Sequence, residues 1–196
     1  MTDVECRYSV ITTFAGWTAL SALRSGSPVK SRADIYPLLE RADFAPLLTP
    51  ASGPVSAEEF ADWHRGATDR IQTAAPKLVV GWATKMLNVY LKTAAYVGDL
   101  GRPGLRDVLH PPIDGGLWNG LESWLNARIE PPNAALLART HAVRRIKLIT
   151  DYPTYEAIIA GCREVAAAVP CRLVELEQFW EGAAAPRARR PLRSRP

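Results

Sequence analysis

The sequence predicts an all-α protein, with a single globular multi-helix domain over residues 1–183 and a disordered Arg-rich tail over 184–196. Apolar residues recur at steps of three and four along the chain, and the alternation typical of strands is not sustained. Hydrophobic residues make up 47% of the 196 residues, which is enough for one real core. The final "RARRPLRSRP" holds five arginines and no acid, so it has nothing to bury.

A first helix is predicted over residues 8–24. Its apolar residues are three or four positions apart, so they share one face, which we expect to point into the core. These residues are Val10, Phe14, Trp17, Leu20 and Leu23. A shorter helix is expected over 33–42, and "PLLTPASGP" predicts a loop after it, because it holds three prolines and one glycine.

Two longer helices are predicted next. Ser56 and Glu59 have the spacing of a capping box, so a helix is expected to begin there and to run to about residue 75. We expect His64, on this helix, to lie at or near the surface. A helix over 77–97 follows Pro76, is apolar nearly all round, and ends at "GDLGRPG".

The second half of the chain predicts further helices. Asp114 is a good N-cap for a helix over 116–129. A basic helix is expected over 133–149, "TDYPTYEAII" begins one that reaches about 168, and "CRLVELEQFWEG" forms a last one. Because no internal repeat is visible, we expect one domain with more helices than a four-helix bundle.

The charge of the chain is concentrated in its tail. The net charge of +4 comes from 24 basic and 20 acidic residues. Without residues 187–196 the count is 19 basic against 20 acidic, so the folded body is close to neutral. The basic pI is therefore weak evidence for nucleic-acid binding by the body itself.

Several classes of protein are disfavoured by composition. The three cysteines are odd in number and lack metal-type spacing, which predicts a reducing compartment. With only three histidines as well, no metal site or cofactor is expected. Asp3 and Glu5 stand where a secretory leader is basic, and no apolar run reaches the ~20 residues of a membrane span. We therefore expect a soluble cytoplasmic protein.

Three polar residues interrupt the apolar helix over 77–97. At 100° per residue, Lys85, Asn88 and Lys92 fall in one narrow strip with Gly81. An ordinary solvent-facing strip is one interpretation. The strip is, however, flanked by Trp82, Val89 and Tyr96 rather than by polar side chains. The other interpretation is therefore a pocket in which burial favours the free, nucleophilic form of a lysine amine.

Asp114 completes this second interpretation. As an N-cap it accepts hydrogen bonds from backbone amides, and the helix dipole keeps its carboxylate ionised. A fixed carboxylate beside a lysine amine is suited to a reaction in which the amine attacks a carbon and the carboxylate stabilises developing positive charge. Lys85 and Asp114 are therefore the candidate catalytic residues.

The region 75–182 resembles the helix-hairpin-helix DNA glycosylases, a superfamily that includes the 8-oxoguanine glycosylases. "GWATK" places Gly81 and Lys85 where the family has its hairpin glycine and catalytic lysine, and "PPIDGGLW" places Asp114 where it has its catalytic aspartate. "VELEQFWEG" is similar to the acidic and aromatic ending of several members. Two features depart from the pattern: Ala83 replaces the second hairpin glycine, and the 29-residue interval from Lys85 to Asp114 is longer than expected.

The resemblance implies DNA as the partner and base excision as the activity. A nucleotide would be flipped out of the duplex, Lys85 would attack C1′ and form a Schiff base, and Asp114 would stabilise the sugar cation. The resemblance implies that aromatic and polar side chains, together with Lys92, contact the nucleotide. It implies that further cationic side chains contact the phosphates. They are Trp82, Asn88, Lys92, Tyr96, His110 and Trp118 for the nucleotide, and Arg139, Arg144, Arg145 and Lys147 for the phosphates.

Two other functions fit the same residues. A small-molecule enzyme or binder would hold an anionic ligand or nucleotide in the Lys-Asn-Lys pocket, and the near-neutral body favours it over duplex binding. A non-catalytic interaction protein, such as a component of bacterial defence or of a toxin–antitoxin pair, is the third. Six tryptophans would suit a partner surface, although we expect Trp17, Trp63 and Trp124 in the core.

Overall fold

The computed structural model describes residues 2–23, 26–49, 53–127, 140 and 143–180. Within these ranges the chain is helical and contains no strand, so the all-α prediction is confirmed. None of the helices in them has the length and hydrophobicity to cross a membrane. The predicted tail over 184–196, Arg139 and most of the helix predicted over 133–149 lie outside the described residues.

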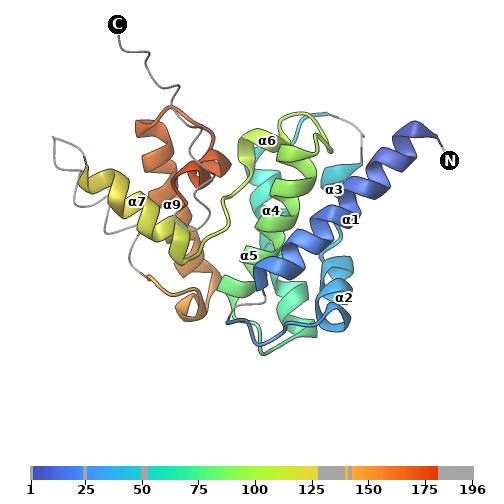
Figure 1. Ribbon diagram of the computed structural model, residues 1–196, viewed down its shortest axis with the longest axis horizontal. Coiled ribbons are helices and arrows are strands. Elements are labelled where there is room, and N and C mark those ends of the chain that lie inside the picture. The colour runs from blue at the N-terminus through green and yellow to red at the C-terminus, as the bar shows by residue number, and fades with distance from the viewer. Residues whose placement is uncertain (1, 24–25, 50–52, 128–139, 141–142, 181–196) are drawn as a thin grey trace, which may run out of the picture.

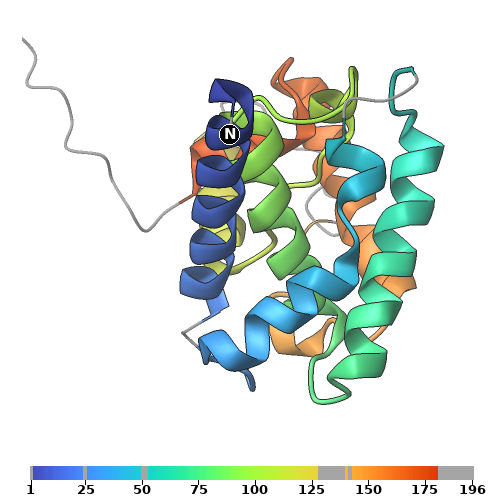
Figure 2. The same cartoon turned by 90° about the vertical axis from the view of Figure 1, so that its right-hand side faces the viewer.

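The first group of helices surrounds α5, as Figure 2 shows. Helices α1, α2 and α4 pack against it, and one hydrophobic core cluster includes side chains from all four, among them Leu23, Ile35, Phe60 and Met86. The bounds are α1 Asp3–Leu23, α2 Arg32–Ala42, α3 Ala45–Leu48, α4 Ala57–Ala74 and α5 Val80–Leu91.

The second group follows in the chain and lies beside the first, coloured yellow to red in Figure 1. Helices α7 and α9 pack around a second core cluster that includes Leu121, Tyr155 and Ile158. A π-helical segment η1 and the short α6 connect the two groups. The bounds are η1 Lys92–Val97, α6 Leu105–Val108, α7 Gly115–Asn126, η2 Ile146–Leu148, α9 Tyr152–Ala168 and η3 Leu173–Phe179.

Two helix starts that were predicted from capping residues are confirmed. Ser56 accepts a hydrogen bond from the Glu59 amide at 3.0 Å, as the capping-box spacing predicted. Asp114 accepts one from the Leu117 amide at 3.1 Å, so its predicted N-cap role is confirmed. A capping side chain replaces a lost backbone partner at the helix start, and this is why these positions could be found from spacing alone.

Several segments differ from the prediction. The first helix begins at Asp3 rather than at residue 8, and α3 includes the start of the predicted loop. The helix expected over 77–97 changes to π-helix at Lys92. Ile146–Leu148 and Leu173–Phe179 are 3-10 helices rather than α-helices. Both 3-10 segments are short, so they gain little from helical cooperativity, and their contacts with α5 and α7 decide their geometry.

The predicted inner face of α1 is confirmed at Leu20 and Leu23, which are 7% and 0% exposed, and is wrong at its first three residues. Val10, Phe14 and Trp17 are 68%, 53% and 51% exposed. The other buried residues of α1, which packs on α5, are Ala15, Gly16 and Ala19. Small side chains allow two helix backbones to approach closely. The face with small residues is therefore buried, and the larger side chains of Val10, Phe14 and Trp17 remain exposed.

Candidate functional site

The polar strip of α5 divides between two environments. Lys85 and Lys92 extend toward the second group of helices and form ion pairs at a partly exposed seam. Asn88 is 1% exposed and lies inside the core. The strip therefore faces neither bulk water nor a single pocket, because α5 is the helix against which the second group packs.

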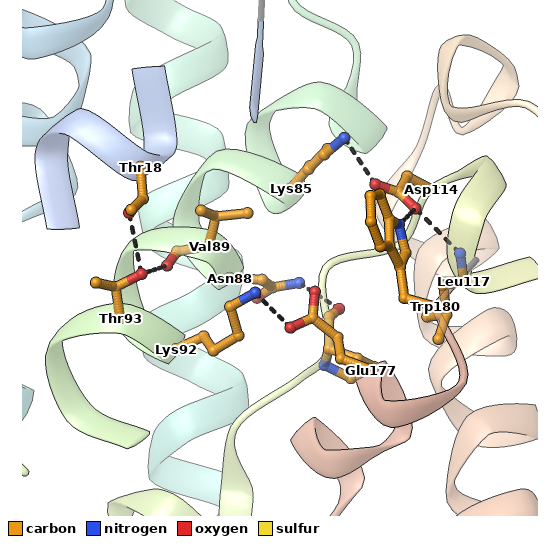
Figure 3. A network of polar contacts seen from close by, with 11 residues as sticks. Thr18, Lys85, Asn88, Val89, Lys92, Thr93, Asp114, Leu117, Glu177 and Trp180 are labelled. Carbon is orange, nitrogen blue, oxygen red and sulfur yellow. Dashed lines mark hydrogen bonds and ion pairs between the residues drawn. The ribbon is translucent and has the colours of Figure 1, made fainter. Parts of the chain in front are cut away.

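Lys85 and Asp114 lie together, as Figure 3 shows. Lys85 Nζ is 2.9 Å from Asp114 Oδ2, and the two side chains are 11% and 18% exposed. The Lys85 amine is also 5.7 Å from the centre of the Trp82 ring. Lys85 comes from α5 and Asp114 from the start of α7, so the pair joins the two groups of helices.

Asp114 is held in its ionised form. Burial acts to raise its pKa, but the charge of Lys85 and hydrogen bonds from Lys85, the Leu117 amide and the Trp180 indole outweigh burial and lower it. The Trp180 indole donates to Asp114 Oδ1 at 2.8 Å. With both oxygens engaged, the carboxylate is fixed in position, as electrostatic stabilisation of a cation requires.

A second ion pair joins the same helix to the second group. Lys92 contacts the Glu177 carboxylate, and these side chains are 27% and 23% exposed. Burial raises the pKa of Glu177, and the nearby Asp114 charge adds to this, while Lys92 and Lys85 act to lower it. Two carboxylates beside one seam are therefore shifted in opposite directions, an arrangement typical of acid and base pairs in enzymes.

Gly81 holds the basic segment 144–147 against α5. A Cβ at this position would overlap the carbonyl oxygen of Ile146, and the Gly81 amide donates to Ile149 O at 2.9 Å. The segment 144–149 of the protein's own chain therefore lies close against the α5 backbone at Gly81. Gly81 also lies in the first turn of α5, whereas the glycosylase resemblance implies a hairpin glycine before the helix.

Two glycines of α7 position η3 in the same way. A Cβ at Gly120 would overlap the Phe179 carbonyl oxygen, and one at Gly116 would overlap the Trp180 ring. Because these glycines are four residues apart, they lie on one face of α7. That face carries the end of η3, which is how Trp180 reaches Asp114 and Glu177 reaches Lys92.

A hollow of about 520 Å³ opens on one side of the Lys85–Asp114 pair. We call it the cationic hollow, because its lining combines the pair with three further cations and with buried tryptophan side chains. The residues that the sequence predicted for the site and that line it are Trp82, Lys85, Asp114, Trp118, Arg144, Arg145 and Lys147. Trp82 and Trp118 are only 6% and 2% exposed, so they support the wall and offer little ring surface.

A second hollow, of about 580 Å³, opens on the other side of the pair. We call it the tryptophan hollow, because Trp17 and Trp180, which are 51% and 38% exposed, line it together with Lys92 and Glu177. A third hollow of about 690 Å³ lies beyond Lys92 and includes Tyr96. The Tyr96 hydroxyl donates to Glu175 at 2.8 Å.

Asn88 and His110, predicted as substrate contacts, belong to a buried polar network. The Asn88 amide donates to Pro111 O at 3.1 Å and to the Tyr155 hydroxyl at 2.9 Å, so its oxygen accepts from His64 Nε2 at 3.0 Å. His110 Nδ1 is 2.9 Å from the Tyr155 hydroxyl. As the structure stands, both side chains are enclosed by the core rather than open to a substrate.

The prediction for His64 is wrong, because this side chain was expected at or near the surface and is fully buried. Burial lowers its pKa to about 4 and also lowers that of His110, while burial raises the pKa of Tyr155. The histidines and Tyr155 are therefore uncharged at neutral pH, although the Arg163 guanidinium contacts His110 Nε2 at 3.3 Å at the edge of the network. Among the described residues, no group of three or more His, Cys, Asp or Glu side chains could hold a metal ion, and this includes the two histidines of the network.

The sequence reasoning missed three residues of this seam. Trp17 was assigned to the core, and Glu177 was quoted only as part of the acidic and aromatic ending. Trp180 was left without a role. The available signal was the spacing of Glu177 and Trp180, three positions apart and so on one side of a helical turn. Nothing in the sequence pointed to the contact of Trp180 with Asp114, which depends on the glycines of α7.

The seam combines groups that bind and that react. It has a lysine in contact with a fixed carboxylate, a second carboxylate with a raised pKa, two exposed indoles and a cluster of cations. Such a set is suited to a ligand with an aromatic ring and an anionic group. No family model, curated protein or solved structure matches the chain. The resemblance to helix-hairpin-helix glycosylases therefore stays a prediction.

Proposed function

We propose that this protein cleaves the N-glycosidic bond of a nucleotide unit, with Lys85 as nucleophile and Asp114 as the stabilising carboxylate. The observation that carries the proposal is the 2.9 Å contact between Lys85 Nζ and Asp114 Oδ2 at a largely enclosed position between two hollows. Damaged bases in DNA are the first substrates to test, because the glycosylase resemblance implies them.

The proposed reaction is balanced in charge and protons. The Lys85 ammonium gives one proton to the departing base, and its nitrogen bonds to C1′ as the bond from C1′ to the base breaks. Asp114, held ionised by its surroundings, stabilises the positive charge that develops on the sugar. Ring opening then moves a proton from the Lys85 nitrogen to the sugar ring oxygen and leaves a Schiff base.

Covalent trapping tests this proposal directly. The protein is incubated with duplexes that carry a panel of damaged bases, and separately with nucleoside 5′-monophosphates, and borohydride is then added. The expected result is a protein adduct, detected by mass, that is absent in Lys85→Gln. Asp114→Asn is expected to slow its formation by roughly 100-fold, the usual cost of losing one electrostatic group at a reacting centre.

Lys77→Gln is the matched control, because Lys77 is an exposed lysine on the turn before α5. It is expected to form the adduct at the rate of the unaltered protein. A circular dichroism melt of each variant separates loss of chemistry from loss of folding. An adduct that persists in Lys85→Gln, or its absence with every substrate, would remove the proposal.

A second candidate function is partner binding, and α1 favours it. Among the described residues, α1 carries five of the eight large hydrophobic side chains that are exposed: Val4, Tyr8, Val10, Phe14 and Trp17. A concentration of exposed apolar side chains is typical of interaction surfaces. Sedimentation velocity tests whether this face joins two copies of the chain. A dimer that dissociates in Val10→Glu would support the role, and a monomer at all concentrations would oppose self-association.

A further inference from the structure

The three hollows follow one another along a single helical surface. The cationic hollow and the tryptophan hollow share Lys85 and Asp114, and the tryptophan hollow shares Lys92 and Glu177 with the third. Lys85 and Tyr96 are eleven residues apart, or about 16 Å along a helix. The two ion pairs therefore stand between neighbouring compartments of one groove, rather than in separate sites.

The charge of the lining changes along this groove. The cationic hollow has four basic side chains and one carboxylate, and the tryptophan hollow has two of each. The third hollow has one basic side chain and two carboxylates. An elongated ligand is therefore recognised with its anionic end toward the segment 144–147, and this gives the groove a direction.

Two cations of the cationic hollow have no ion-pair partner within the described part of the chain. Arg144 forms an ion pair with Glu122, and Lys85 forms one with Asp114. Arg145 and Lys147 are exposed and have no ion-pair partner among the residues that the structure describes. A phosphomonoester carries nearly two negative charges near neutral pH, whereas a phosphodiester carries one, so these two cations match a terminal phosphate best.

The tryptophan hollow is suited to a flat ring. Trp17 and Trp180 offer exposed indole surface, and Val89 and Pro112 add apolar lining. Stacking of a nucleic-acid base on an aromatic side chain is favourable and needs no particular base, because every base has a π face. Glu177, in the same hollow, adds a carboxylate that can accept a hydrogen bond from an amino group on the ring edge.

We infer that the groove binds a single nucleotide with a terminal phosphate, its phosphate in the cationic hollow and its base in the tryptophan hollow. The sugar then lies beside Lys85 and Asp114, which belong to both hollows. The inference deepens the proposed function and rests on it only for the position of the bond to be cleaved. The near-neutral charge of the body without residues 187–196 also favours a small ligand over a duplex.

Equilibrium binding tests the inference without any need for cleavage. The full chain is titrated by calorimetry with adenosine 5′-monophosphate, adenosine, ribose 5-phosphate and inorganic phosphate, and tryptophan fluorescence is followed in parallel. The monophosphate is expected to bind at least tenfold more tightly than adenosine and than ribose 5-phosphate, and to quench fluorescence. A single-stranded oligonucleotide and a duplex, each without a terminal phosphate, are expected to bind more weakly than the monophosphate.

Two variants separate the two ends of the ligand. Lys147→Gln is expected to weaken the monophosphate tenfold and to leave adenosine unchanged, because it removes a phosphate contact only. Trp17→Leu is expected to weaken adenosine and the monophosphate alike and to leave ribose 5-phosphate unchanged. Both side chains are exposed, so neither change disturbs the core. Lys77→Gln is the control and is expected to bind all ligands normally.

Each result has one meaning. Equal affinity for adenosine and its monophosphate, or tighter binding of the duplex, would overturn the inference, and so would a Lys147→Gln variant that weakens all ligands equally. A monophosphate that binds as expected, with no borohydride adduct from any substrate, would leave the inference standing and remove the cleavage proposal. An adduct formed with duplex DNA, with no binding of the monophosphate, would do the reverse.

Discussion

Helix α5 meets the second group of helices through two kinds of polar contact. Asn88 reaches inward to an uncharged network with His64, Tyr155 and His110, in which the described polar atoms are paired. Lys85 and Lys92 reach outward to Asp114 and Glu177, in ion pairs that remain partly exposed. The two regions lie within eight residues of the same helix and differ in burial and in charge.

This difference separates a structural role from a functional one. Neutral groups that are fully hydrogen-bonded can be buried, and removal of one leaves its partners unpaired at a high cost. Ion pairs at a partly exposed seam contribute little to stability, because desolvation and screening offset their attraction. Stability therefore accounts for the network, whereas the ion pairs are better explained by the hollows on either side of them.

The largest predicted effect is at Asn88. Asn88→Leu removes hydrogen bonds to His64, Pro111 O and Tyr155, and we expect it to lower the free energy of unfolding by about 3–5 kcal/mol. Urea denaturation followed by circular dichroism measures it. If Asn88→Leu cost no more than Lys92→Met, the distinction between the two regions would be lost.

The second prediction concerns acid. The pKa of His64 is about 4 in the folded protein and near 6.5 when unfolded, so the unfolded chain binds more protons between these values. Stability from this group is fully present above pH 6.5 and is lost as the pH falls through 4. The loss is on the order of 3 kcal/mol.

Urea denaturation at a series of pH values tests this assignment. His64→Gln is expected to flatten the decline between pH 6.5 and 4, although the remaining lowered pKa of His110 continues to contribute. An unchanged slope in His64→Gln would show that His64 is not the group that titrates.

The third prediction concerns how η3 is attached. Gly120→Ala places a methyl group against the Phe179 carbonyl, so η3 must move, at a cost of about 1–3 kcal/mol. The displacement is expected to change the fluorescence of Trp180 and to weaken ligand binding in the tryptophan hollow. Gly115→Ala is the matched control, because nothing lies within 4 Å of a Cβ there. Equal effects of the two changes would contradict the close contact.

The smallest predicted effect is at the ion pairs. The double change Lys92→Met and Glu177→Leu is expected to change the free energy of unfolding by less than about 1 kcal/mol, because no charge is left unpaired. Lys92→Met alone is expected to cost more, because it leaves Glu177 unpaired, but less than Asn88→Leu, because burial already raises the pKa of Glu177 and favours its protonation. Urea denaturation at pH 7 checks this, and a loss of several kcal/mol would show that the seam is structural.

The sequence predicted correctly those features that depend only on residues close together in the chain. The caps at Ser56 and Asp114 depend on residues three positions apart, and both were found. The faces of helices were harder to assign. In α1 the regular spacing of Val10, Phe14 and Trp17 indicated a buried face, but the small residues Ala15, Gly16 and Ala19 are buried instead.

The candidate site was predictable in part. The proximity of Lys85 and Asp114 followed from a chemical argument about an amine and a helix-capping carboxylate, and the structure places them in contact. Asn88 has nearly the same angle on the helix as the two lysines, yet it belongs to the core. Spacing along one helix gives the direction of a side chain and carries no information about which neighbour lies there.

By itself the sequence determined the helical class, the helix starts at capping residues and the polar strip on α5, because periodicity and capping act over a few residues. Only the tertiary structure decided that Asn88 is sealed in a neutral network while Lys85 and Lys92 border a groove. The physical reason is that burial and charge pairing depend on the second group of helices. A close contact at Gly81 holds the segment 144–149 against α5, and close contacts at Gly116 and Gly120 hold the end of η3 against α7. Each contact joins segments that lie far apart in the chain.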